Sequence, residues 1–294
     1  MALALAFALV AAGCGGDDDE DESAATATTS TTATAECRPE SLQTVEAGEL
    51  TIGTDNPAFP PWFEGGSSGN AWELNDPASQ QGFESAVAYA VSEVLGYSDL
   101  DVNWVVVPFN QSFRPGPKNF DFDINQISYT PERDTAVDFS ESYYDVNQSV
   151  VAVKGTPITN AKSKADLKEY KLGAQIGTTS LEYITEMIQP DQEPSVYDTN
   201  NDVVSALQAK QIDGAVVDLP TAFYMAGAQI DNGAIVGKFP ALAGSGEHFG
   251  MVFEDGSPLV KCVNQALRIL KARGTLNKIQ EQWLGQKVNV PELN

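Results

Sequence analysis

The sequence predicts an α/β protein with mostly parallel sheets, and two observations support this fold class. From residue 50 onward, short runs of apolar and β-branched residues alternate with segments whose apolar residues recur at helical spacing. The alternation runs through two series, one on each side of residue 150, which predicts two lobes. The chain has 294 residues, 42% of them hydrophobic, and is therefore long enough for two domains.

The first series begins with an apolar strand predicted at residues 50–53, followed by a rigid loop that is rich in proline ("TDNPAFPP"). Next, Phe83, Val87 and Val91 recur at helical spacing, and Gly96 ends this predicted helix. The remaining strands of the series are predicted at 101–109, 120–128 and 149–155.

The second series continues the same alternation. Its strands are predicted at 171–177, 195–199, 212–218 and 248–253. Its helices are predicted at 164–170, 178–189, 201–211 and 219–229, and the strongly helical segments 257–274 and 275–285 follow.

One segment between the two series, "SYTPERDTAVDFSESYY", places a cation where a helix is predicted to begin. Thr130 is a favourable N-cap, and Pro131 is favoured at the first helical position. Arg133 then falls in the first turn, where the helix dipole repels positive charge. The sequence therefore predicts that an anion lies close to Arg133.

The N-terminus is similar to the leader of an exported lipoprotein. Residues 1–13 are apolar and uncharged but too short to span a membrane, as in a signal peptide. "VAAGC" then ends on Cys14 and resembles a lipid-attachment signal, although Ala11 stands where leucine is preferred. The alternative is a plain apolar terminus with an incidental cysteine. Residues 14–36 lack bulky apolar side chains and are strongly acidic, which predicts a disordered tether.

The overall charge excludes some classes of partner. Acidic residues outnumber basic residues by 41 to 17, and the net charge is −24. Nucleic acid and anionic lipid are therefore not expected as main partners, because both need clustered Lys and Arg. His248 is the single histidine, and no cluster of histidines and cysteines in the sequence has metal-ligand spacing. We therefore expect no metal, no cofactor and no catalytic residue.

Two cysteines remain if Cys14 carries a lipid. In an exported protein, Cys37 and Cys262 predict one disulfide between the start of the folded region and the last part of the chain. The alternative is two separate thiols.

The landmarks along the chain, taken in order, resemble one known family. They read "GELTIGTD", "GFESAVAYAVSEVLG", "ISYTPERDTAVDFSESYY", "LGAQIGTTS", "ALQAKQIDGAVVD" and "VNQALRILKARGTLNKIQEQWLG". Together they are similar to the bacterial extracytoplasmic solute-binding proteins, family 3, of polar amino-acid ABC importers. The resemblance implies a two-lobed periplasmic-binding-protein-like fold of type II, with two hinge strands and a ligand cleft between the lobes. Lobe 1 would comprise residues 48–148 and 250–294, and lobe 2 would comprise 149–249.

The resemblance also implies a function. The protein would bind a free L-amino acid as a monomer and deliver it by hinge closure to the transmembrane permease subunits of an ABC importer. It would touch the outer face of the membrane only through its lipid anchor. Some dehydratases share this fold, so a dehydratase-type enzyme is one alternative, and a ligand-sensing domain is another.

For the ligand carboxylate, the resemblance points to Arg133, because a guanidinium makes two parallel hydrogen bonds to a carboxylate. The alternative is a surface arginine paired with a neighbouring acid, Glu132 or Asp134. Thr179 has capping-box spacing to a glutamate three residues later, and its N–H is expected to bind the same carboxylate. The Thr178 hydroxyl and the Ser128 amide complete the predicted set.

For the ammonium, Asp218 ends a predicted strand at the edge where ligands bind in α/β sheets. The alternative is an N-cap for the helix that follows. A backbone carbonyl near Gln126 is expected to assist it.

For the ligand side chain, Asp55 and Phe59 are the candidates, with Trp62 as cleft wall or lobe core. Asp55 favours a polar or basic ligand, and its alternative role is turn chemistry before Asn-Pro. Residues 65–79 and 108–126 depart from the family pattern next to this pocket, so the ligand's identity does not follow from the resemblance.

Overall fold

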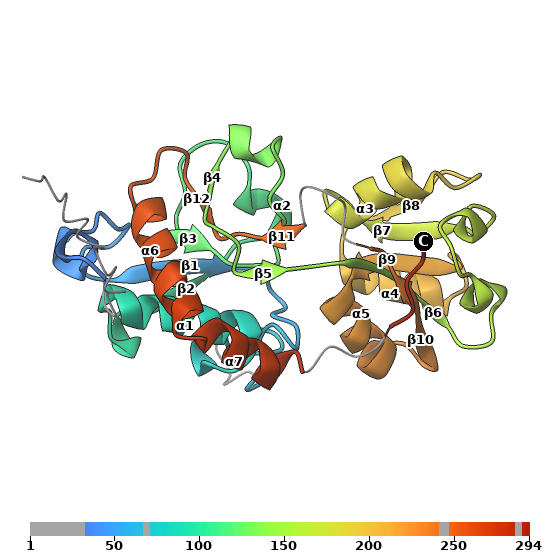
Figure 1. Ribbon diagram of the computed structural model, residues 1–294, viewed down its shortest axis with the longest axis horizontal. Helices are drawn as coiled ribbons and strands as arrows, with labels where there is room; N and C mark the ends of the chain where they lie inside the picture. The colour runs from blue at the N-terminus through green and yellow to red at the C-terminus, as the bar shows by residue number, and fades with distance from the viewer. Residues whose placement is uncertain (1–32, 67–70, 241–246, 286–289) are drawn as a thin grey trace, which may run out of the picture.

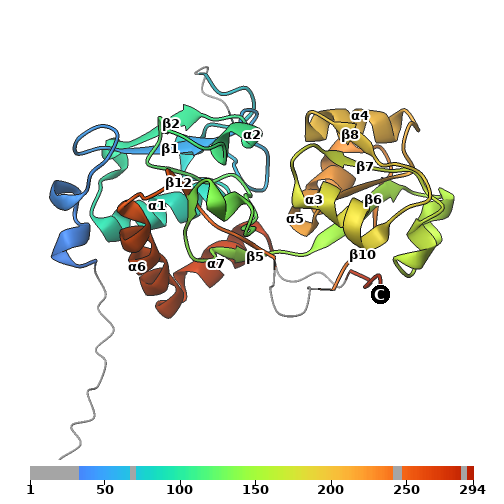
Figure 2. The same ribbon diagram turned by 90° about the horizontal axis from the view of Figure 1, so that it is seen from above.

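The computed structural model describes residues 33–66, 71–240, 247–285 and 290–294. Within these ranges the chain forms two separate halves, each built around a five-stranded sheet (Figures 1 and 2). The α/β fold class predicted from the sequence is confirmed. Both sheets are mixed, however, rather than mostly parallel.

The first sheet has the strand order β2-β1-β3-β12-β4. Its strands are β1 (Leu50–Thr54), β2 (Val102–Val106), β3 (Phe122–Asp123), β4 (Asp138–Phe139) and β12 (Val252–Phe253). β1 runs parallel to β2 and β3, whereas β12 runs antiparallel to β3 and β4. The antiparallel strand arises because the chain returns to this sheet from the other half of the molecule.

Helices α1 (Phe83–Leu95), α6 (Leu259–Ala272) and α7 (Thr275–Trp283) pack together in the first half (Figure 1). Phe83, Val87 and Val91 are fully buried, as the helical spacing predicts, and Gly96 ends α1 in the left-handed conformation. The short helix α2 (Phe109–Ser112) follows β2.

The second sheet has the strand order β10-β6-β9-β7-β8. Its strands are β6 (Gln148–Val153), β7 (Leu172–Gln175), β8 (Ser195–Tyr197), β9 (Gly214–Asp218) and β10 (Gly233–Lys238). Its helices are α3 (Thr179–Glu182), which continues as a π-helix over Tyr183–Ile188, α4 (Asn200–Gln208) and α5 (Leu219–Tyr224), which continues over Met225–Gln229. Apolar side chains cover both faces of this sheet. The consecutive residues Val150 and Val151 of β6 point to opposite faces and belong to different apolar clusters.

Short 3-10 helices complete the described elements. They lie at Ala35–Cys37, Pro39–Ser41, Pro77–Ser79, Asp99–Asp101, Arg133–Thr135, Pro157–Asn160 and Ala165–Leu167.

Two short strands connect the halves. β5 (Tyr144–Asp145) pairs antiparallel with β11 (His248–Phe249), and β5 leads directly into β6 (Figure 1). The strand predicted at 248–253 is therefore two strands, because Gly250 separates the connecting strand β11 from β12 of the first sheet.

Two of the predicted domain boundaries, the end of the tether and the end of the first lobe, differ in the structure. The predicted tether ran to residue 36, but Ala33 is buried and Thr34 donates from its N–H to Gln265 Oε1 at 3.0 Å. The predicted first lobe ran to residue 294, but Leu293 is buried in the second half and its N–H donates to the Lys238 carbonyl. Hydrogen bonding along β10 therefore holds the last residues against the second sheet. The proposed signal peptide and Cys14 lie outside the described residues.

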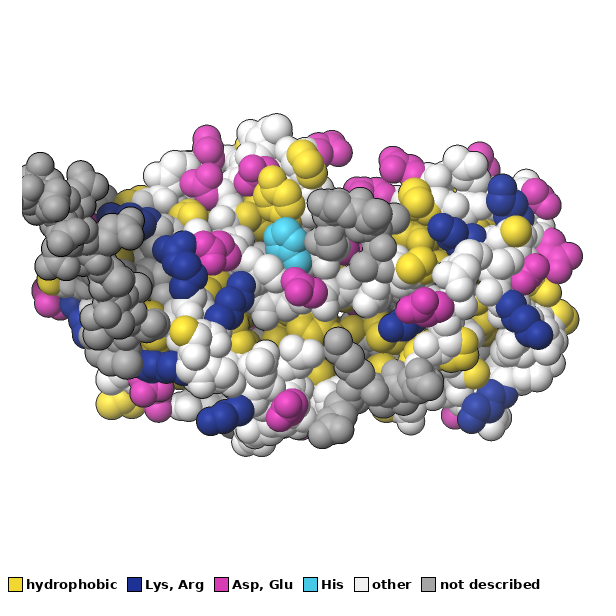
Figure 3. All heavy atoms as spheres, in the orientation of Figure 1, with side chains coloured by type: hydrophobic (Ala, Val, Ile, Leu, Met, Phe, Trp, Pro, Cys, Tyr) yellow, Lys and Arg dark blue, Asp and Glu magenta, His cyan; other side chains and the backbone are white. Residues whose placement is uncertain are grey.

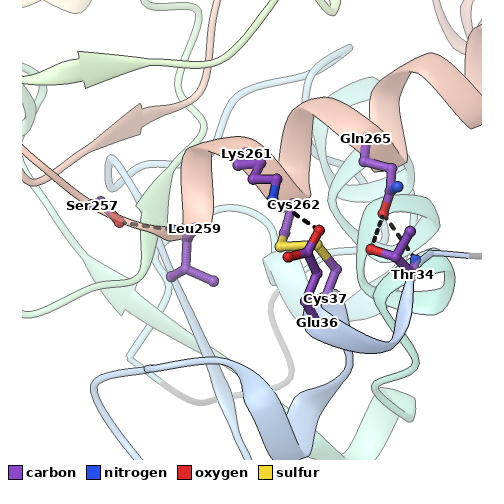
Figure 4. Close-up of a disulfide and its surroundings, with 8 residues drawn as sticks. All are labelled: Thr34, Glu36, Cys37, Ser257, Leu259, Lys261, Cys262 and Gln265. Carbon is purple, nitrogen blue, oxygen red and sulfur yellow. Dashed lines mark hydrogen bonds and ion pairs between the residues drawn. A yellow bond between two sulfur atoms is a disulfide. The ribbon is translucent and has the colours of Figure 1, made fainter.

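Cys37 and Cys262 form a disulfide in the structure, as Figure 4 shows. It joins the first 3-10 helix to α6, across 225 residues of sequence. Two polar contacts flank it, namely Lys261 Nζ to Glu36 at 2.8 Å and Thr34 to Gln265. The first described residues are thereby attached to the first half of the protein.

On the face shown in Figure 3, Lys and Arg side chains are scattered among acidic side chains and do not gather in one patch. No helix in the described part of the chain is both long and apolar enough to cross a membrane.

Candidate functional site

A cavity of about 150 Å³ lies between the two halves and is lined by residues from both of them. It brings together most of the residues predicted as a ligand site, although they come from distant parts of the sequence. These residues are Asp55, Phe59, Gln126, Ser128, Arg133, Thr178, Thr179 and Asp218.

Arg133 begins a single 3-10 turn rather than a long helix. The predicted conflict with a helix dipole is therefore small, because three residues align few peptide dipoles. Its N–H donates to Thr130 Oγ1 at 3.2 Å, but Glu132, not the predicted Thr130, is at the N-cap position of this turn.

The Arg133 side chain is buried, with 8% exposure, and is held by carbonyls from both halves. Nη1 donates to the Ser128 carbonyl at 2.6 Å, and Nη2 donates to the Gly177 carbonyl at 2.7 Å. The guanidinium carbon lies 4.4 Å from the Phe113 ring centroid. Among the described residues no carboxylate forms an ion pair with it. Arg133 is thus a buried cation that lacks an anionic partner, which rules out the surface pair with Glu132 or Asp134.

Burial lowers the pKa of Arg133, and the nearby charges of Glu182, Glu247 and Asp218 partly offset this effect. The guanidinium stays charged, since its pKa begins far above neutrality. The cavity therefore contains a fixed positive charge that a carboxylate would neutralise.

Backbone N–H groups also face this region. Around Ser128, the ladder bonds run from Tyr129 N to the His248 carbonyl and from Gly250 N to the Ile127 carbonyl. In this antiparallel pattern the Ser128 N–H points away from β11, on the side that lines the cavity.

On the opposite wall, α3 begins one residue earlier than the predicted capping box. Gly177 adopts a φ of +73°, and Thr178 is the N-cap, so Thr179 is the first helical residue. The Thr178 hydroxyl accepts from Leu181 N at 3.2 Å and donates to the Gln175 carbonyl at 2.7 Å. The capping-box prediction for Thr179 was wrong, and the Thr178 hydroxyl is already used by the cap.

Asp218 ends β9 and lies at the N-cap position of α5, but its side chain makes no cap hydrogen bond. Its Oδ1 instead accepts from Gln148 Nε2 at 3.0 Å. Burial raises the pKa of Asp218 well above its usual range, and the nearby charge of Glu247 raises it further. An ammonium group in the cavity would compensate this buried acid.

Gln126 has a left-handed backbone conformation, with φ of +48°. Its N–H donates to Glu84 Oε1 at 2.7 Å, and its side-chain amide donates to the other oxygen of the same carboxylate. Tyr143 also donates to Glu84, which is fully buried, and burial raises the Glu84 pKa to about 7. The backbone N–H and one of the two side-chain N–H groups of Gln126 are therefore occupied, and its backbone carbonyl is the group predicted to bind a ligand.

At the other end of the cavity, Asp55 Oδ1 accepts from Asn56 N at 2.8 Å, and burial raises the Asp55 pKa. Phe59 lines the cavity and its ring lies 6.3 Å from that of Tyr224 in the other half. This bond reaches only the next residue, and Pro57 has no N–H to donate, so the Asp55 side chain does not form the turn proposed as its alternative role.

Trp62 does not line the cavity. It is 1% exposed and packs edge-on against Phe83, Tyr144 and Phe249, while its Nε1 donates across the halves to Thr221 Oγ1 at 3.2 Å. Phe63 and Phe109 supply the aromatic wall in its place. Trp62 is therefore a core residue, as the second interpretation of the sequence allowed, because the chain after Pro61 turns it inward.

Sequence reasoning missed Glu247, which precedes β11 and connects both halves. Its Oε1 accepts from Ser128 Oγ at 2.8 Å and also from the Thr179 hydroxyl. Gln148 Nε2 donates to both of its oxygens, at 2.9 and 3.1 Å. No local pattern marks this residue, since the partners lie 68 to 119 positions away.

We expect Glu247→Ala to loosen the contact between the halves, because it removes an acceptor shared by Ser128, Thr179 and Gln148. Small-angle X-ray scattering should give a larger radius of gyration for this variant than for the wild type. Glu254→Ala is the matched control, since Glu254 accepts from Lys118 N within the first half. Equal radii for Glu247→Ala and the wild type would contradict the prediction.

Comparisons with known proteins agree with this geometry. The sequence profile of the bacterial extracellular solute-binding proteins, family 3, matches residues 50–286. The arginine-binding extracellular protein ArtP of Bacillus subtilis is 26% identical over 70% of this chain and 79% of its own length. The L-cystine-binding protein TcyJ of Escherichia coli is 28% identical over 83% of this chain and 85% of its own length.

Solved structures extend the similarity to three dimensions. An ancestral arginine-binding protein bound to glutamine matches 82% of this chain and 100% of its own, with a TM-score of 0.65 and 28% identity. The profile covers well over half of the sequence, and the two-lobed fold agrees with it. The chain therefore belongs to the bacterial extracellular solute-binding proteins, family 3.

Proposed function

We propose that the protein binds a free L-amino acid, with polar or basic side chains favoured, and delivers it to the permease subunits of an ABC importer. The single observation that carries this proposal is Arg133, a buried cation without a carboxylate partner among the described residues, in a cavity shared by both halves. A ligand carboxylate would supply the missing anion. In this role the protein binds its ligand without chemically changing it.

The donors and acceptors around the cavity suit the two charged groups of an amino acid. Arg133 and the N–H groups of Ser128 and Thr179 would bind the carboxylate, because charge-assisted hydrogen bonds are the strong ones. Asp218 and the carbonyl of Gln126 would bind the ammonium. Asp55 and Phe59, together with Phe63 and Phe109, would surround the side chain.

Ligand binding would favour the closed arrangement of the halves. Arg133 belongs to the first half, whereas Thr179 and Asp218 belong to the second, so one ligand contacts both. Only the closed state offers all of these contacts, and a ligand shifts a conformational equilibrium by its difference in affinity for the two states. The permease subunits would then recognise the closed form.

We also propose that the mature protein is a monomer held outside the cell membrane by a lipid on Cys14. The acidic segment that follows Cys14 would act as a tether to the domain that contains the Cys37–Cys262 disulfide. A disulfide suits an exported protein. Cleavage of residues 1–13 would leave Cys14 as the first residue.

A thermal-shift screen of the twenty amino acids tests the proposed function. A ligand at about 1,000 times its Kd stabilises the native state by about 4 kcal/mol. For a folded region of this size that corresponds to an increase in Tm of about 10 °C. We expect one amino acid or a small chemical group of them to give such a shift.

The control in this screen is the same panel with Arg133→Ala, in which the shift should fall to a few degrees or less, because a 100-fold weaker Kd removes about 3 kcal/mol of the stabilisation by the ligand. If no amino acid raises the Tm of the wild-type protein, the proposed function is wrong. Chemical conversion of a bound compound would instead indicate the dehydratase-type alternative, and mass spectrometry of the recovered ligand detects it.

A further inference from the structure

Behind one wall of the cavity lies a group of buried polar atoms that have no hydrogen-bond partner within the described part of the protein. They are Thr54 Oγ1, Ser112 Oγ, Asn125 Nδ2 and both carboxylate oxygens of Asp123. Thr54 and Asn125 line the cavity itself. Because buried polar groups are nearly always paired, such a cluster needs a physical explanation.

Asp123 lies one step deeper than the cavity wall. It is on β3, in register with Gly53 of β1, and it is fully buried. Asn125 follows two residues later, so its side chain is expected on the same face as that of Asp123 if the extended conformation continues. Ser112, which ends α2, is the polar neighbour of the carboxylate, and Phe109 at the start of α2 lines the cavity.

Gly53 makes room for the Asp123 side chain. A Cβ atom at position 53 would lie only 2.6 Å from Asp123 Oδ2 and 2.9 Å from a methyl carbon of Val107. The carboxylate therefore lies over the backbone of β1, directly before Thr54 and Asp55. This backbone leads straight to the end of the cavity where the ligand side chain is placed.

An unpaired carboxylate in this position is unfavourable in the empty protein. Taking a charge out of water without a partner costs several kcal/mol. Burial raises the pKa of Asp123 well above its usual range, and the charges of Glu84 and Asp55 raise it further, whereas the Ser112 hydroxyl and the charge of Lys118 offset this only in part. An apolar residue of similar size would pack here at lower cost, so stability of the empty protein does not explain the aspartate.

The charges around the cavity indicate which ligand would relieve this cost. In the proposed function, Arg133 pairs with the ligand carboxylate, and Asp218 pairs with its ammonium. Asp55 and Asp123 then remain as two acids at the side-chain end, with no described cation in an ion pair with either. An uncharged ligand side chain would leave both of them without a partner.

We infer that Asp123 is a specificity-determining residue whose carboxylate, together with Asp55, binds the cationic end of a basic amino acid. The inference rests on the proposed function and narrows its ligand class to side chains that end in an ammonium or a guanidinium. The side chains of Ser112 and Asn125 would border this cation.

The test compares arginine with citrulline, which has nearly the same shape but an uncharged end. Isothermal titration calorimetry is carried out on the wild type, on Asp123→Asn and on Asp255→Asn. Asp255 is exposed in the first half, so its variant loses the same charge outside the cavity. We expect the wild type and Asp255→Asn to bind arginine at least about tenfold more tightly than citrulline.

In Asp123→Asn we expect most of this preference to disappear, with the Kd for citrulline changed by less than about threefold. A purely structural role would change both ligands equally or change only the Tm. If Asp123→Asn does not fold, Asp123→Ser is measured in the same way. The ratio of the two Kd values in the wild type, for citrulline and for arginine, is a further test that needs no variant.

Three outcomes would overturn the inference. An unchanged ratio in the folded Asp123 variants would show that water alone fills the space beside Asp123 and that Asp55 or another group detects the charge. Equal, tight binding of arginine and citrulline by the wild type would leave the proposed function intact and refute the cation subsite. Binding of no amino acid would refute the proposed function, and the inference with it.

Discussion

Arg133→Ala is expected to weaken amino-acid binding at least about 100-fold, which corresponds to about 3 kcal/mol. The variant removes the guanidinium that would neutralise the ligand carboxylate inside a cavity closed by both halves. It also leaves the carbonyls of Ser128 and Gly177 without their donors. Isothermal titration calorimetry with the amino acid found in the thermal-shift screen measures the loss.

Two further variants sharpen this prediction. Arg133→Lys keeps the charge but cannot make two parallel hydrogen bonds, so its affinity should fall between the wild type and Arg133→Ala. Arg268→Ala removes an exposed arginine that pairs with Glu141, and it should bind like the wild type. Wild-type affinity in a folded Arg133→Ala protein would refute the assigned carboxylate site.

Asp218→Asn is expected to reduce affinity for the amino acid about 30- to 100-fold, because a neutral amide cannot compensate the ligand ammonium. The same change should leave the empty protein as stable as the wild type or more stable. The reason is that burial and the neighbouring Glu247 already make the charged form of Asp218 costly. A lower affinity together with an unchanged or higher Tm would therefore distinguish a ligand contact from a structural role.

The matching ligand control is the analogue of the same amino acid that lacks the α-amino group. The wild type should bind this analogue far more weakly than the amino acid, whereas Asp218→Asn should discriminate little between them. Strong discrimination by a folded Asp218→Asn variant would show that another group binds the ammonium. Asp145→Asn, on the connecting strand β5 and exposed, is a control for the loss of charge.

Much of the fold followed from local pattern. The spacing of Phe83, Val87 and Val91 predicted α1, and the apolar runs predicted β1, β6, β7 and β9 close to their observed positions. These predictions succeeded because secondary structure depends on which residues alternate over a short stretch. The mixed direction of the sheets was not predicted, because strand direction depends on where the chain enters each sheet from the other half.

The candidate site followed from the order of the landmarks rather than from any one of them. Arg133, Thr179 and Asp218 were named from the sequence, and the structure places all of them around one cavity. The structure differed from the prediction where the role of a residue depended on the direction of its side chain or on its hydrogen-bond partner. Trp62 turned into the core, and the cap of α3 moved to Thr178 because Gly177 turns the chain first.

The amino-acid sequence alone was enough to predict the α/β class, the family and the residue types able to bind a carboxylate and an ammonium. It could not predict which of these groups already have partners inside the protein. Glu247 accepts hydrogen bonds from Ser128, Thr179 and Gln148, whereas Asp123 is fully buried with no ion pair among the described residues. The physical reason is that pairing and burial depend on contacts between residues far apart in the chain, and short-range periodicity carries no information about those contacts.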